Sequence, residues 1–69
     1  MNVVGVVQRD GKRWFVQSQA GERFELLEAD VKERMEGLTV RVAGNLADGF
    51  GFDMFDVPKQ IIVQHLKVI

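Results

Sequence analysis

The first 27 residues contain three short strand-like segments, the first rich in β-branched valine and the next two with alternating faces, separated by turns that contain glycine. The segments are Val3–Val7, Arg13–Ser18 and Arg23–Leu27. Asp10-Gly11 precedes the second segment and Gly21 precedes the third. Asp-Gly tolerates the positive φ angles of tight hairpin turns, and alternation with a period of two is typical of half-buried strands. We therefore predict three successive β-strands joined by tight turns, with a bulge or bend at Gly5 in the first.

The same alternation predicts which side chains face inward. It places Trp14 and Val16 on one face of the second strand, and Phe15 and Gln17 on the other. The inward face should share a single interior with alternating residues of the third and fourth strands. The predicted core is Trp14, Val16, Phe24, Leu26, Val40 and Val42. Phe15 then becomes a candidate surface aromatic.

The period changes after residue 29. Val31 and Met35 lie four residues apart, as on one face of a helix, and Asp30 with Glu33 has the spacing of a capping box. Gly37 stands where a left-handed C-terminal cap belongs. We predict a short α-helix over 31–36, about two turns long, which must pack on the rest of the chain because so short a helix is unstable alone. Val31 and Met35 would close one end of the interior.

Two further strands are predicted, Leu38–Val42 and Gln60–Val68. In the last strand, Ile61 and Val63 share one face, whereas Leu66 and Val68 share the other. A β-bulge near Gln64-His65 would bring both pairs to the same side.

The chain length limits how these elements can pack. Sixty-nine residues, of which 46% are hydrophobic and 28% charged, predict one small folded domain over 1–69. Such a chain buries only about 60% of its unfolded surface, and without cysteine it has no disulfide to stabilise it. Packing within the chain or association between chains must supply the stability. Five short strands cannot bury two sheet faces, so we predict an all-β barrel that closes its own edges.

This order of three strands, one helix and two strands resembles the OB-fold, a five-stranded Greek-key barrel, as found in small bacterial OB-fold-like domains. The resemblance covers nearly the whole chain and is carried by Gly5–Val7, Trp14–Val16, Gly21–Leu26, Gly37–Gly44 and Ile61–Val63. An SH3-like barrel is the alternative, and it would lack an α-helix over 31–36. The OB resemblance implies that the loops after the first and fourth strands flank a ligand-binding face.

The residue inventory argues against catalysis. His65 is the single histidine, and Ser18 and Thr39 are the single serine and threonine. These residues assemble no nucleophile–base pair and no multi-histidine metal site within one chain. We expect a non-enzymatic protein without cofactor or metal. No apolar run reaches the roughly 20 residues that span a bilayer, and no signal peptide is visible, which predicts a cytoplasmic protein that does not enter membranes.

Two features are candidates for binding. The first hairpin gathers basic residues, with Arg9, Lys12 and Arg13 in the turn region and Arg23 on the paired strand. The second feature is the apolar segment 49–57. It contains Phe50, Phe52, Met54 and Phe55, and three exposed phenylalanines would exceed the apolar patch of a typical monomer.

These features support two hypotheses. The chain binds another protein or its own copy through Phe50, Phe52, Met54 and Phe55, and the net charge of −1 favours this choice. An open sheet edge could contribute to such a contact. The alternative is a single-stranded nucleic-acid binder in which aromatic side chains stack on bases and basic ones contact phosphates. That interface would use Arg9, Lys12, Arg13, Phe15 and Arg23.

Overall fold

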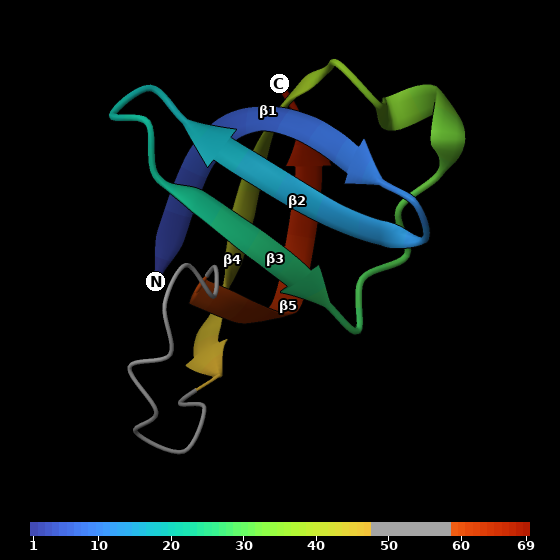
Figure 1. Ribbon diagram of the computed structural model, residues 1–69. Helices are drawn as coiled ribbons and strands as arrows, with labels where there is room; N and C mark the ends of the chain where they lie inside the picture. The colour runs from blue at the N-terminus through green and yellow to red at the C-terminus, as the bar shows by residue number, and fades with distance from the viewer. Residues whose placement is uncertain (48–58) are drawn as a thin grey trace.

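A computed structural model of the chain describes residues 1–47 and 59–69, and it contains five strands and one short 3-10 helix (Figure 1). The elements follow the order β1, β2, β3, η1, β4 and β5. Their bounds are β1 Asn2–Asp10, β2 Arg13–Ser18, β3 Arg23–Leu27, η1 Glu33–Met35, β4 Thr39–Ala47 and β5 Lys59–Val68. The three predicted N-terminal strands are confirmed, and β4 is longer than predicted.

The five strands form a closed barrel in the order β1-β2-β3-β5-β4, with β4 pairing back onto β1. All neighbouring pairs are antiparallel except β3 and β5, which run parallel. Each strand therefore has a neighbour on both sides. The open sheet edge considered from the sequence is absent among the described residues.

The hairpins have the predicted turns. Asp10 pairs with Arg13, so that Gly11 and Lys12 form a two-residue loop, and Gly11 has a φ of 65°. The pairing of β1 with β2 and β4 runs through Gly5 without a register shift, so β1 has no bulge there, and the glycine serves close strand packing instead. A Cβ on Gly5 would lie 2.2 Å from the carbonyl oxygen of Gln17, so only glycine permits this close approach of β1 and β2.

The interior of the barrel is apolar. Five of the six predicted core residues are buried, and Trp14 is partly buried against them. The buried cluster is Val3, Val7, Val16, Phe24, Leu26, Val40, Val42 and Ile61. Val31 and Met35 pack against this cluster, as predicted for the residues that close one end.

The predicted bulge in the last strand is confirmed. Ala43 pairs with His65 whereas Gly44 pairs with Val63, which leaves Gln64 as the extra residue of β5. The extra residue changes the alternation, so that Val63 and Leu66 both pack against the core. Gly44 lies at the same place, and a Cβ there would lie 2.1 Å from the carbonyl oxygen of Ile62.

The predicted α-helix over 31–36 is wrong. Lys32 is extended, with φ −96° and ψ 150°, and one 3-10 turn follows it. Asp30 pairs with the Lys32 ammonium at 3.2 Å instead of capping the turn. Gly37 has the expected positive φ of 85°. So short a segment forms too few helical hydrogen bonds to offset the free-energy cost of nucleating an α-helix. The segment forms one 3-10 turn across the end of the barrel instead. The strand order does not depend on this segment.

Candidate binding surfaces

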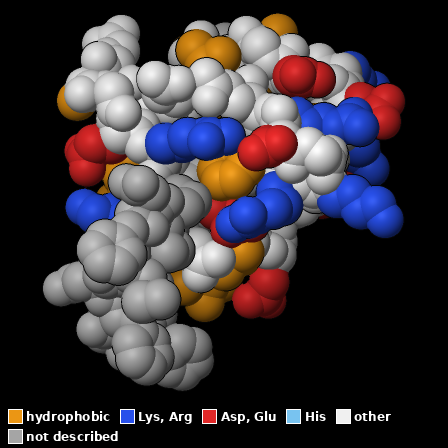
Figure 2. Space-filling view, viewed as in Figure 1, with side chains coloured by type: hydrophobic (Ala, Val, Ile, Leu, Met, Phe, Trp, Pro, Cys, Tyr) orange, Lys and Arg blue, Asp and Glu red, His pale blue; other side chains and the backbone are white. Residues whose placement is uncertain are grey.

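The outward side chains of β1, β2 and β3 form a surface that we call the front face. The strand register arranges them in rows across the barrel. One row runs from Gln8 through Phe15 and Glu25 to Gln60, and the neighbouring row runs from Thr39 through Val6 and Gln17 to Arg23. Figure 2 shows this face, where basic side chains flank a hydrophobic patch over β2.

Phe15 lies at the centre of the front face but is 2% exposed. The guanidinium carbon of Arg23 is 3.9 Å from the centroid of its ring, and that of Arg13 is 5.4 Å away. Both distances are within the range of cation–π attraction. The prediction that Phe15 is a surface aromatic is therefore wrong, because guanidinium groups lie over a ring that points out of the barrel.

Glu25 is a buried carboxylate beside Phe15, with 7% of its surface exposed. The Arg13 guanidinium donates two hydrogen bonds to it, Nε to Oε2 at 2.8 Å and Nη2 to Oε1 at 2.7 Å. Gln60 Nε2 donates a third at 2.9 Å to Oε1. These contacts lower the pKa of Glu25 to about 2, with the Arg13 hydrogen bonds as the main cause, against the opposing effect of burial. The same pair raises the pKa of Arg13.

A hollow of about 320 Å³ lies over β1 and β2, beside Phe15 and the side chains that cover it. Its lining combines apolar and hydrogen-bonding groups: Val4, Gly5, Val6, Gln8, Gln17, Ser18, Gln19 and Thr39. Val4 and Val6 are 42% and 39% exposed, which is high for β-branched side chains on a strand. Gln8 Nε2 donates a hydrogen bond of 2.6 Å to Gln17 Oε1, which leaves the other polar atoms of the two amides available.

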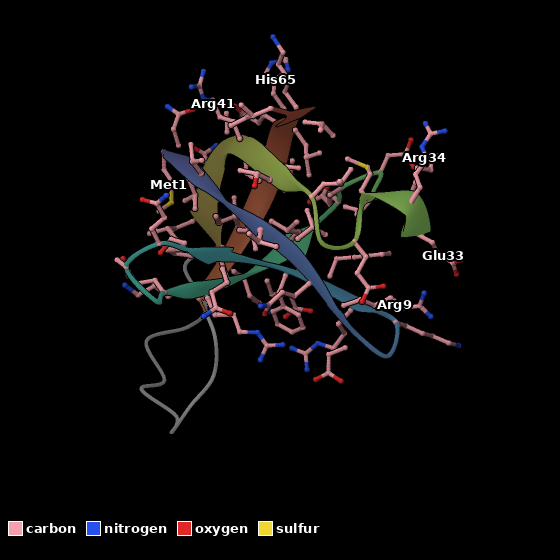
Figure 3. The ribbon with its side chains drawn as sticks, turned by 90° about the horizontal axis from the view of Figure 1, so that it is seen from above. Met1, Arg9, Glu33, Arg34, Arg41 and His65 are labelled. Carbon is pink, nitrogen blue, oxygen red and sulfur yellow. The ribbon has the colours of Figure 1, made fainter. Side chains whose placement is uncertain are left out.

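The basic residues of the first hairpin do not form one cluster. Arg9 lies at the barrel end, 3.1 Å from Glu33 and over the Trp14 ring at 5.8 Å. Figure 3 shows Arg9 and Glu33 on the same side of the molecule. Arg13 is occupied by Glu25, and Lys12 is exposed in the turn. Of the five predicted nucleic-acid contacts, the structure brings together three, Arg13, Phe15 and Arg23.

Phe50, Phe52, Met54 and Phe55 lie outside the described residues. Sequence analysis did not select Glu25, Gln60 or the hollow lined by Val6 and Gln17. The sequence does contain one indication of Glu25 and Phe15, because the alternation in their strands places both side chains on the outer face of the sheet. Pairing between them depends on the register of β2 and β3.

Residues 1–47 and 59–69 contain no group of three or more acidic or histidine side chains able to hold a metal ion. In this part of the chain, no helix is long and apolar enough to cross a membrane. Comparison of the chain with protein-family models, with curated proteins and with solved structures finds no match.

Proposed function

We propose that this chain is a non-enzymatic binding module of the OB type, which binds a polypeptide on its front face. The fold part of the proposal rests on strand order. β4, β1, β2 and β3 lie side by side in that order, which is the Greek-key arrangement, and β5 closes the barrel. The missing α-helix was the feature expected to separate this fold from an SH3-like barrel, so the strand order carries the inference instead.

The observation that carries the function is the hollow beside Phe15. Its lining offers exposed valine side chains next to glutamine amides, a combination that suits an apolar side chain and the amide groups of a peptide backbone. Two of the three arginines near the front face have a carboxylate partner, Arg13 with Glu25 and Arg9 with Glu33, which leaves Arg23 as the one without an ion pair among the described residues. The surface therefore favours a ligand recognised by shape and hydrogen bonds over one recognised by charge.

The test is selection from a displayed random-peptide library, followed by titration of the enriched peptides against the folded chain. Val6→Asp places a charge in the hollow and should weaken binding at least about tenfold, since a buried unpaired charge is costly. Leu46→Asp is the matched control, because Leu46 is a 48% exposed apolar residue outside the hollow. Equal losses in the two variants, or no enriched peptide, would contradict the proposal.

Single-stranded nucleic acid is the second candidate, and one observation favours it. Arg23 is stacked on Phe15, and no carboxylate within the described ranges forms an ion pair with it. With Arg9 and Arg13 already paired, Lys12 and Arg23 remain as phosphate contacts. Two contacts predict a slope of about −1.4 in log affinity against log salt. An oligonucleotide titration that gives this slope, together with loss of binding in Arg23→Gln, would favour this candidate over the peptide.

A further inference from the structure

Two cations face each other on the barrel wall away from β2 and β3. Arg41 of β4 pairs directly with Lys67 of β5 in the antiparallel ladder. Arg41 lies between buried Val40 and Val42, so it points outward, and both Arg41 and Lys67 are exposed. Like charges in directly opposed positions destabilise a sheet. The fold retains an arrangement that weakens it.

Among residues 1–47 and 59–69, no acidic side chain forms an ion pair with Arg41 or Lys67. The four ion pairs formed within the described part of the chain use Arg9, Arg13, Lys32 and Lys59, and each carboxylate of these pairs belongs to residues 22–33. Neither β4 nor β5 contains an aspartate or glutamate. Figure 3 shows Arg41 and His65 projecting at the top of the view, away from Arg9 and Glu33 at its right. A net charge of −1 therefore conceals a locally cationic surface.

Apolar side chains border the two cations. Val4 pairs with Arg41 and continues the row onto β1, where it is 42% exposed. Ile69, two residues after Lys67 and therefore on the same outward phase, donates its backbone N–H to the Thr39 carbonyl and is 65% exposed. Apart from the single imidazole of His65, strands β4 and β5 contain no aromatic side chain on which a base could stack. This surface thus combines positive charge with aliphatic contacts.

We propose that the outer face of β4 and β5, with Arg41 and Lys67 at its centre, binds an acidic polypeptide segment that also carries aliphatic side chains. Carboxylates of the segment would lie near both cations, and their attraction to Arg41 and Lys67 would offset the repulsion between the two positive charges. Its aliphatic side chains would cover Val4 and Ile69. A nucleic acid fits less well, because this face offers two cations and only the His65 ring for stacking, and a chain of net negative charge repels a polyanion at longer range. This face adjoins the hollow at Val4, but the inference does not depend on the front face binding a peptide.

The test uses a synthetic peptide of repeating Glu-Leu-Glu units, a Gln-Leu-Gln peptide of the same length and an oligothymidylate. Binding is measured at low salt by amide chemical shifts of the folded chain. The acidic peptide should shift β4 and β5 amides, and the neutral peptide should not. Arg41→Gln/Lys67→Gln should weaken acidic-peptide binding about fivefold, as expected for the loss of two exposed ion pairs. Lys32→Gln/Arg34→Gln changes the net charge equally at exposed sites elsewhere and should leave binding unchanged.

The double variant provides a second readout. Because the substitutions remove like-charge repulsion, its melting temperature should equal or exceed that of the original chain. Equal weakening by the two double variants, or shifts spread over the whole barrel, would overturn the proposal by showing an unspecific charge effect. Tighter binding of oligothymidylate than of the acidic peptide at β4 and β5 would also overturn it. Val6→Asp tests the front face separately, so failure of one proposal is distinguishable from failure of the other.

Discussion

The guanidinium carbon of Arg23 lies 3.9 Å from the centroid of the Phe15 ring, on the outside of the barrel. The ring points away from the apolar interior and is nevertheless 2% exposed. An aromatic side chain on the outer face therefore contributes to the stability of the sheet. It is not free to stack on a ligand unless Arg23 moves.

We expect Phe15→Ala to destabilise the chain by about 3 kcal/mol, because it removes a buried aromatic ring. Arg23→Gln should cost about 0.5–1 kcal/mol, the worth of an exposed cation–π contact. Urea unfolding followed by Trp14 fluorescence measures both changes. Val4→Ala on the same face is the control and should have a small effect, since Val4 is 42% exposed. A stability of Phe15→Ala close to that of Val4→Ala would show that the ring is not buried in solution.

Stability should decrease in acid because of Glu25. Its pKa is about 2 in the folded chain, below the ordinary value of about 4.3 for an unfolded glutamate. The unfolded chain therefore takes up the proton first as the pH falls. The Glu25 contribution is present above about pH 4.5 and is lost towards pH 2. Its size is at most about 3 kcal/mol, and it is reduced by solvent because the Arg13 side chain is 56% exposed.

Glu25→Gln should remove this part of the pH dependence, leaving a flatter stability profile between about pH 2 and 4.5. Denaturant unfolding at several pH values measures it. Glu33→Gln is the control, because the Glu33 side chain is 81% exposed and its pairing with Arg9 is weak. An unchanged profile in Glu25→Gln would mean that other carboxylates cause the acid sensitivity.

The two arginines of the first hairpin should differ in importance. Arg13→Gln leaves the buried Glu25 carboxylate without its cation, so it should lower the melting temperature and raise the pKa of Glu25. Arg9→Gln breaks an exposed pair with Glu33 and should change the melting temperature little. Calorimetry and side-chain carboxyl NMR provide the two measurements. Equal melting temperatures of the variants would contradict the assignment of Arg13 to the structural network.

Gly44 should tolerate substitution much less well than Gly37. Gly44→Ala would bring a Cβ to 2.1 Å from the Ile62 carbonyl oxygen, which forces β4 and β5 apart at the bulge. Gly37→Ala meets nothing within 4 Å and suffers only from its positive φ of 85°, a strain of about 1 kcal/mol. The yield of soluble protein and the urea midpoint distinguish the two. Similar losses would show that the bulge relaxes to accept a side chain.

Local sequence patterns were sufficient to predict most of the strands. Alternation in β2 and β3 depends on successive side chains pointing to opposite faces, so the sequence identified Val16, Phe24 and Leu26 as inward. In a regular strand Val63 and Leu66 would point to opposite faces although both are apolar, and this disagreement likewise indicated the bulge. Helix prediction over 31–36 failed for a physical reason. Capping and spacing signals indicate where a helix can start, whereas the barrel end determined how much helix the segment forms.

The sequence by itself determined an all-β barrel with an apolar interior, because strand alternation and turn chemistry are local properties of the chain. Only the tertiary structure decided the use of the charged residues. Arg13 meets Glu25, Arg9 meets Glu33, and Arg41 meets Lys67 because register and closure bring distant strands together. Electrostatic energy depends on the distance between groups in space, and separation along the chain does not specify that distance.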